Sequence, residues 1–145
     1  MSDRPYPRKN CNAYLWEAWT GTGDYQNRVR DFVERLARVR GYTDWQGFFN
    51  NTLTSNFLPF RSESDGALGP ARQPAKVFAH ALWLRLIPQL GIRAIVCFGS
   101  PAKAGFERVI AELGVKSQPE LLPLRHSRCG LVTNADIARA KTLPF

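Results

Sequence analysis

Three short segments of this 145-residue chain carry the side chains best suited to chemistry. The first surrounds Asn56, the second runs from Gly99 to Lys103, and the third runs from Arg125 to Cys129. Each of them follows a stretch with the composition of a β-strand.

Gly99, Ser100, Pro101, Ala102 and Lys103 combine a glycine turn, a hydroxyl group and the expected start of a helix. The exposed N–H groups and the dipole of a helix N-terminus suit a phosphate oxygen. Ser100 could donate a hydrogen bond to the same phosphate. The alternative is an ordinary strand-to-helix turn in which Ser100 is the N-cap.

Residues 125–128 read Arg-His-Ser-Arg and place an imidazole beside a hydroxyl group and two guanidinium groups. His126 could carry or donate a proton, and so stabilise negative charge that develops on a heterocycle or leaving group. The alternative is a solvated basic loop.

Asn56 stands where the expected strand becomes a loop. Its carboxamide offers a donor beside an acceptor, which is the pair needed to read the edge of a base. Phe57 or Phe60 could stack on that base, an interaction worth about 1–3 kcal/mol per base. The alternative is an Asn that stabilises its own turn, with two aromatic side chains in the core.

The first half of the chain predicts two helices, one strand and a long loop. The clearer helix runs from Asp24, as N-cap, to Val39, and Gly41 supplies its stop. An earlier helical stretch covers roughly Cys11 to Trp19. Asn51 to Leu58 is expected to be a short strand, and the Ser-, Gly- and Pro-rich residues 62–74 predict a long loop.

The second half predicts a helix, a buried strand, a helix, a second strand and a last helix. Their expected ranges are Gln73–Leu90, Ile92–Phe98, Pro101–Leu113, Glu120–Leu124 and Asn134–Lys141. This order predicts an α/β fold, a three-layer αβα sandwich with a short, mainly parallel central sheet. Ligands of such sheets bind at the carboxyl ends of the strands, so the three segments should meet at one edge.

The charge of the chain favours a polyanionic partner. Lys and Arg number 20 against 12 Asp and Glu, which gives a formal net charge of +8. Residues 71–145 hold 11 of the basic and 4 of the acidic side chains. Nucleic acid is the commonest partner of such a one-sided excess. The alternative is a basic surface without a ligand.

Composition also excludes several classes of protein. No apolar run reaches the roughly 18 residues needed to span a bilayer, and the N-terminus has no apolar signal-peptide core. A cytoplasmic protein without a membrane partner is therefore expected. Cys11, Cys97 and Cys129 are too widely spaced for a disulfide framework or an iron–sulfur cluster, so no metal and no cofactor is predicted. His80 is expected to be a packed core histidine.

Together the three segments resemble the uracil-DNA glycosylase superfamily. Val96 to Lys103 is similar to that family's apolar strand and GSxAQK segment, and His126-Ser127 resembles its HPS motif without the Pro. Asn56 falls where the family keeps its base-reading Asn. The resemblance covers most of residues 10–130.

The resemblance implies extrusion of a nucleotide, loss of its base as an anion and attack by water on the sugar. Asn56 would bind the flipped base, with Phe57 beside it, and His126 would donate to the base oxygen as the catalytic residue. The residues expected to bind DNA phosphates are Gly99, Ser100, Lys103, Ser127 and Arg128.

One departure from the family bears on activity. The family's first motif follows the first strand and positions the attacking water, but only nine residues precede Asn10 and none of them forms an apolar strand. The expectation is a single glycosylase-like domain over residues 1–145 whose first strand is missing, either naturally or through the placement of the start codon. A homodimer or a partner chain should then cover the exposed sheet edge.

Three functions remain open on the sequence. The first is a base-excision enzyme that hydrolyses the N-glycosidic bond of a deaminated base. The second is a non-catalytic nucleic-acid-binding or damage-sensing protein, and the third is a regulatory protein that binds a partner chain.

Overall fold

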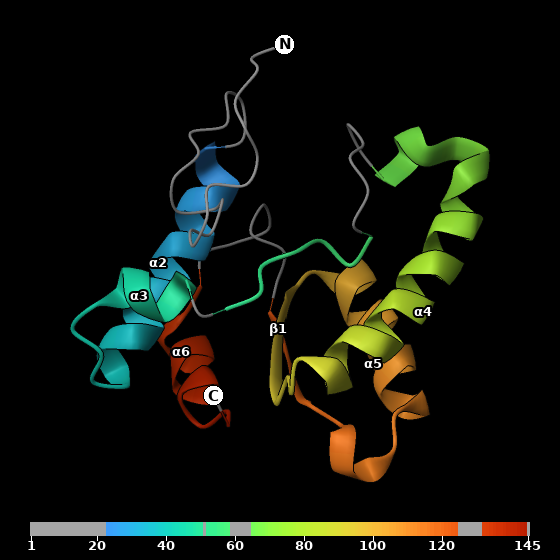
Figure 1. Ribbon diagram of the computed structural model, residues 1–145. Coiled ribbons are helices and arrows are strands. Elements are labelled where there is room, and N and C mark those ends of the chain that lie inside the picture. The colour runs from blue at the N-terminus through green and yellow to red at the C-terminus, as the bar shows by residue number, and fades with distance from the viewer. Residues whose placement is uncertain (1–22, 51, 59–64, 125–131, 145) are drawn as a thin grey trace. The chain divides into compact units, whose positions relative to one another are not determined.

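The computed structural model describes residues 23–50, 52–58, 65–124 and 132–144. These residues form a mixed α/β structure that is mostly helical, with a two-stranded parallel sheet packed against helices (Figure 1). The elements in chain order are α2 (Gly23–Val39), α3 (Trp45–Asn50), η1 (Asp65–Ala71), α4 (Arg72–Gln89), β1 (Ala94–Phe98), α5 (Ser100–Glu112), η2 (Val115–Ser117), β2 (Glu120–Leu124) and α6 (Asn134–Lys141).

The chain divides into two compact units, and each is described by itself. The first unit comprises Met1–Thr54 and Ser127–Lys141, and the second comprises Ser55–His126 and Thr142–Phe145. Among the described residues, the first unit contains α2, α3 and α6. The second contains the sheet with α4 and α5.

The sheet of the second unit joins β1 and β2 in parallel, as the order of elements predicts. Ala94 lies opposite Glu120, Cys97 opposite Pro123, and Phe98 opposite Leu124. Hydrogen bonds continue past both ends of the register, because Glu120 N–H donates to Arg93 O (2.9 Å) and Gly99 N–H donates to Leu124 O (3.0 Å). The two strands therefore end side by side.

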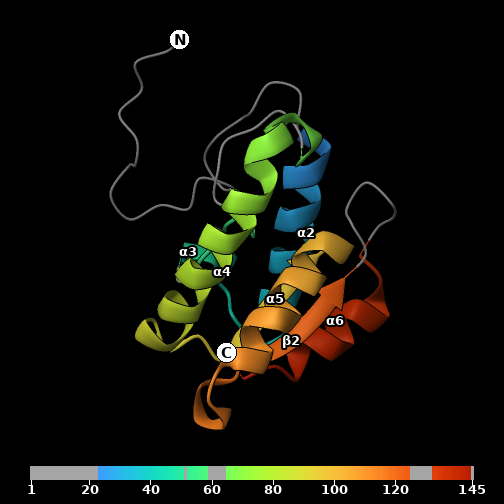
Figure 2. The ribbon, with the colours of Figure 1, turned by 90° about the vertical axis from the view of Figure 1, so that its right-hand side faces the viewer.

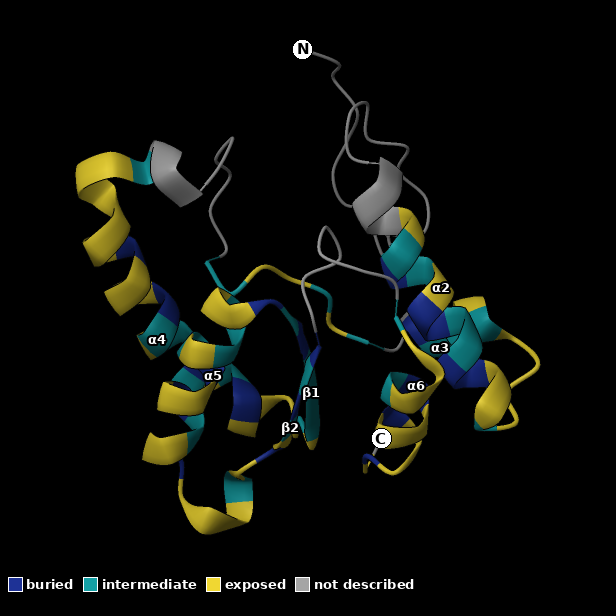
Figure 3. Cartoon of the chain, turned by 180° about the vertical axis from the view of Figure 1, so that it is seen from behind, coloured by how far each residue is buried: buried dark blue, intermediate teal, exposed yellow. Residues whose placement is uncertain are grey.

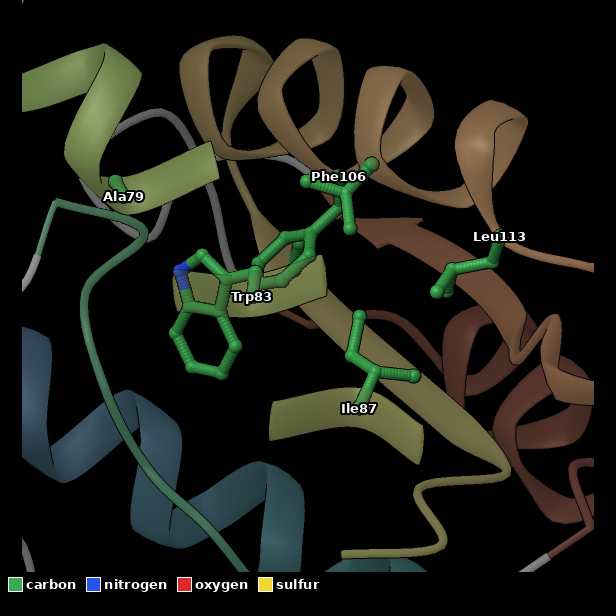
Figure 4. Close-up of a cluster of buried hydrophobic side chains, with 7 residues drawn as sticks. Ala79, Trp83, Ile87, Phe106 and Leu113 are labelled. Atoms are coloured by element: carbon green, nitrogen blue, oxygen red, sulfur yellow. The ribbon is translucent and has the colours of Figure 1, made fainter. Parts of the chain in front are cut away.

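Helices α4 and α5 lie side by side and enclose the core of the second unit with the sheet (Figure 2). The buried positions of α4 recur every four residues and form one stripe along the helix. The core residues are Ala79, Trp83, Ile87, Cys97, Phe106, Val109 and Leu113 (Figure 4). Trp83 and Phe106 pack with their ring centroids 5.1 Å apart, which joins the two helices at the middle of the core.

Two expected elements are wrong. Residues 52–58 contain no strand, and the carbonyl of Phe57 accepts a hydrogen bond from the side chain of Trp83 (Nε1–H to O, 2.8 Å). Residues 65–71 of the expected loop form a 3₁₀ helix kinked at Gly69, and α4 follows directly. Pro74 is compatible with α4 because the first N–H groups of a helix have no partner within it.

Helix α3 is not predicted by the sequence pattern, and its start depends on a short-range cap. Gly47 N–H donates to Asp44 Oδ1 at 2.9 Å, so Asp44 satisfies one of the first N–H groups of α3. The helical stretch expected over roughly Cys11 to Trp19 lies outside the described residues. The boundaries of α2, α4, α5 and α6 agree with the sequence to within a few residues. Gly41 ends α2, and α6 has the predicted bounds.

In the first unit, α2 packs against α3 and α6 through one apolar side, which does not include the exposed Val39. Its buried residues are Val29, Phe32, Val33, Leu36 and Ala37. The short helix α6 begins with a capping box, in which Thr133 N–H and Oγ1–H donate to Asp136 Oδ2 and Asp136 N–H donates to Thr133 Oγ1.

Arg35 of α2 and Arg40, which directly follows α2, contact the two ends of α6. Arg35 donates from Nη1 to Val132 O and from Nη2 to Asn134 Oδ1, both at 2.8 Å, and it also pairs with Asp31. Arg40 Nη1 donates to Lys141 O at 3.2 Å. Because α6 has eight residues, these contacts contribute much of its attachment.

No helix among the described residues is long and apolar enough to cross a membrane.

Arg35→Lys should loosen α6, because an ammonium group cannot reproduce the fork that reaches two acceptors at once. We expect a loss of about 1–2 kcal/mol in the free energy of unfolding, measured with urea, and faster amide exchange in α6. Arg38→Lys is the matched control, since Arg38 is exposed and pairs with Glu34 within the same helix. A loss in the control as large as that of Arg35→Lys would contradict the assignment.

Candidate functional site

The carboxyl edge of the sheet begins at Gly99. Its backbone has φ 93° and ψ 158°, a conformation that favours glycine, and its N–H reaches across to Leu124 O. Gly99 is also the N-cap of α5, which has no hydrogen bond from a capping side chain. The alternative in which Ser100 is the N-cap is therefore wrong, and Ser100 is instead the exposed first residue of the helix.

Lys103 lies in the first turn of α5, where its N–H donates to Gly99 O at 3.1 Å. Its ammonium group pairs with Glu107 Oε1 at 2.5 Å, and both side chains are about half exposed. Exposed pairs of this spacing contribute about 0.3–0.5 kcal/mol. An anion at the helix N-terminus could therefore attract Lys103 away from Glu107 at little cost.

The Arg125–Cys129 segment leaves β2 from Leu124, whose carbonyl accepts the bond from Gly99. His126, Ser127 and Arg128 lie outside the described residues. The structure thus defines where this segment starts, which is beside the start of the Gly99–Lys103 segment. The roles expected for its side chains stay predictions.

Asn56 is exposed, and the structure gives its carboxamide no hydrogen-bond partner among the residues that it describes. Its neighbour Phe57 is fixed at two points. The Phe57 carbonyl accepts from Trp83, and the Phe57 ring packs edge-on against Phe106 with centroids 5.1 Å apart. The segment that carries Asn56 is therefore held against α4 and α5.

Gly105 of α5 has no side chain and so leaves the space that the Phe57 ring occupies. A Cβ atom at this position would lie 2.6 Å from ring atoms of Phe57, which is closer than real Cβ contacts. The Phe57 ring packs in the core, which agrees with the alternative in which Phe57 is a core aromatic side chain. Its contact with a base stays a prediction. Phe60 lies outside the described residues.

His80 is not the packed core histidine expected from the sequence. Its Nε2 lies 2.9 Å from Glu112 Oε1, and 26% of its side chain is exposed. The pair links α4 to the last turn of α5. Sequence reasoning missed it because the two residues are 32 positions apart and only the packing of the helices brings them together.

Cys97 is a free, buried thiol on β1. Burial raises its pKa from 9.0 to about 11, with a further increase from Glu107 and a smaller opposing effect of Lys103. The thiol is therefore neutral at physiological pH and a weak nucleophile. Within the described residues, no group of three or more His, Cys, Asp or Glu could hold a metal ion.

The structure places Leu124, the residue before the Arg125–Cys129 segment, beside Gly99, and it holds Phe57, the neighbour of Asn56, against α4 and α5. Comparisons of the chain with protein-family models, with curated proteins and with solved structures gave no match.

Gly105→Ala should lower the free energy of unfolding by about 1–3 kcal/mol, because the new methyl group meets the Phe57 ring. In a Phe57→Ala background the same change should be neutral or stabilising by up to about 1 kcal/mol, as Ala favours helix over Gly. Urea unfolding of the four chains measures this coupling. Gly114→Ala is the control, since a Cβ there meets open space; equal effects of Gly105→Ala in both backgrounds would contradict the contact.

Cys97 should make stability fall at alkaline pH. Because the folded pKa lies above the unfolded value, the contribution of the neutral thiol is fully present below pH 9.0 and is lost as the pH rises to about 11. The difference in unfolding free energy between the wild type and Cys97→Ala should shrink over this window. A difference that stays constant across it would show that the thiol is not buried as described.

Proposed function

We propose that this chain binds DNA at the carboxyl edge of its parallel strands and holds an extruded base there, as a relative of the uracil-DNA glycosylase superfamily. The hydrogen bond from Gly99 N–H to Leu124 O carries the proposal. It joins the starts of two segments that resemble separate motifs of that family, and a parallel pair is where such motifs would have to converge. The proposal includes the finer fold, a three-layer αβα sandwich to which β1 and β2 contribute.

Phosphate binding is supported by the N-terminus of α5. The exposed Ser100 hydroxyl and the helix dipole act at one point, and Lys103 can turn toward an anion at the cost of a weak exposed pair. In the proposal, Ser127 and Arg128 contact a second phosphate from the neighbouring segment. The net charge of +8 strengthens the attraction at longer range.

Base recognition is assigned to the carboxamide of Asn56. A base is recognised best by a group that is already fixed before binding, because less conformational entropy is then lost on association. Trp83 and Gly105 hold the adjoining Phe57 by its carbonyl and its ring, which supports such a fixed Asn56.

The chemical step of the proposal is hydrolysis of the bond between C1′ of the sugar and the base nitrogen. The bonding electron pair leaves with the base, and the N–H of His126 stabilises the negative charge on the base oxygen. Water adds its oxygen to C1′ and releases a proton. The products of the step are an abasic site and a free base. The resemblance assigns no residue of this chain to position that water, so a binding protein that senses damage is the second candidate.

Binding is tested with labelled duplexes that contain uracil, hypoxanthine or no lesion, by fluorescence anisotropy between about 50 and 200 mM salt. Affinity should fall steeply with salt. Lys103→Ala should weaken binding several-fold and lower the salt slope by about one, whereas Glu107→Gln should strengthen binding by releasing Lys103. Lys116→Ala is the matched control, because Lys116 follows the opposite end of α5.

Excision is the second readout of the same experiment. Alkaline cleavage of the uracil and hypoxanthine strands should reveal abasic product, which is lost in His126→Ala and strongly reduced in Asn56→Ala, with Asn27→Ala as control. Lesion-specific binding without abasic product at enzyme excess would leave the damage-sensing function. Salt-independent binding, or equal effects of Lys103→Ala and Lys116→Ala, would overturn the DNA interface itself.

A further inference from the structure

One long side of β1 has no neighbouring strand among the described residues, where β1 pairs with β2 alone. Charged side chains often protect such an edge from association, but β1 contains none. Its Cys97 is buried and its other four residues are half-buried (Figure 3). A strand that is apolar on both faces is typical of the interior of a sheet, so this edge has the character of a contact surface.

The free backbone groups at this edge belong to Ala94 and Val96. Glu120 N–H donates to Arg93 O at 2.9 Å, and Ala94 lies opposite Glu120 in the register. Because alternate residues of a parallel ladder bond to the same neighbour, the N–H and C=O groups of Ala94 and Val96 point away from β2. These groups form no hydrogen bond with another described residue. Backbone polar groups are nearly always paired in folded proteins, so they are available to an added strand.

Arg93 provides a positive charge at the start of this edge. It is exposed and forms no ion pair with another described residue. The carboxylate in the two strands belongs to Glu120, which lies opposite Ala94 and therefore shares its face of the sheet. The side chain of Arg93 belongs to the other face, because successive side chains of a strand alternate. An acidic side chain directly opposite Arg93 would therefore find a cation without a competitor in the sheet.

We propose that the free edge of β1 binds an extended segment of a partner protein as an added antiparallel strand. The apolar centre of the segment would lie opposite Ala94 and Val96, and an acidic residue would lie opposite Arg93. Main-chain hydrogen bonds supply the affinity in this mode of recognition, and the cross-strand ion pair adds specificity. The inference is independent of DNA binding, because it uses the long side of β1 and not the carboxyl ends of the strands.

The charge at the edge favours this occupant over a second copy of the chain. In an antiparallel pairing of two β1 strands, the register places Arg93 opposite Ile95, Cys97 or Gly99 of the second copy, and none of these is acidic. Each copy also carries a net charge of +8. Nucleic acid could pair with Arg93 but would leave the apolar side chains of β1 uncovered. A single strand buries less than the roughly 800 Å² per partner of a standard interface, so the complex should be transient.

The probe is a fluorescein-labelled peptide with alternating Val and Thr followed by one Glu, titrated with the full chain and measured by anisotropy. In the proposed register, the first and third amides before the Glu bond to β1, and the second and fourth point away. N-methylation of the first pair should weaken binding at least about tenfold, because it removes two hydrogen-bond donors. N-methylation of the second pair is the matched control and should change affinity less than about twofold.

A charge exchange tests the ion pair. Arg93→Glu should weaken binding of the Glu peptide about fivefold and should strengthen binding of a companion peptide with Lys in place of Glu. Arg108→Glu is the matched control, since Arg108 is exposed on α5, and it should have less than half of this effect. Both variants change exposed residues, so circular dichroism and Tm should stay unchanged and report that each chain is folded.

Amide hydrogen exchange locates the added strand without any substitution. Saturating peptide should slow the exchange of the Ala94 and Val96 amides about tenfold. The amides of Ile95 and Cys97 already face β2 and should be unchanged. This alternation along one strand is expected only if the peptide pairs with the free edge.

Five outcomes would overturn the proposal. The first is no saturable binding up to about 1 mM peptide. The second is equal affinity for the two N-methylated peptides, and the third is equal loss in Arg93→Glu and Arg108→Glu. The fourth is displacement of the peptide by duplex DNA, which would make a polyanion the occupant. The fifth is a dimer in sedimentation whose Ala94 and Val96 amides are protected without peptide, which would make a second copy the occupant.

Discussion

The arrangement of the second unit around Phe57 depends on the indole N–H of Trp83. A buried indole N–H must find an acceptor, and here the acceptor is the carbonyl of Phe57, 26 residues away in the chain. This one bond fixes an irregular segment against two helices and sets the Phe57 ring over Gly105. The packing of α4 on α5, the path of the chain at Asn56 and the absence of a side chain at position 105 are thus parts of one arrangement.

Much of the second half was predictable, because its signals are local. The apolar run of β1 and the helical ranges of α4 and α5 are set within single elements, and β2 and α6 have the predicted bounds. The failures have a common cause. Residues 52–58 have a strand composition, but the Phe57 carbonyl accepts a hydrogen bond from a side chain of α4, and His80 has an apolar neighbourhood in sequence but a carboxylate partner in space. Partners distant in the chain decide both.

The candidate site, like the fold, could be predicted from the sequence only in part. Its residue types and their order along the chain were readable, and the parallel pairing of β1 with β2 follows from the order of elements. The hydrogen bond that joins Gly99 to Leu124 was not, because it depends on the register of the two strands. A partner chain at the exposed sheet edge stays a prediction.

The position of Pro123 limits how this sheet can grow. Glu120 and Leu124 direct their backbone groups toward β1, so in a parallel ladder those of Leu121 and Pro123 point to the opposite edge of β2. Proline has no N–H to offer there, and a strand added beside β2 would lose a hydrogen bond at its centre. Growth of the sheet is thus directed toward β1, whose five residues include no proline. One residue makes the two edges of a two-stranded sheet unequal, closing one to neighbours and leaving the other open.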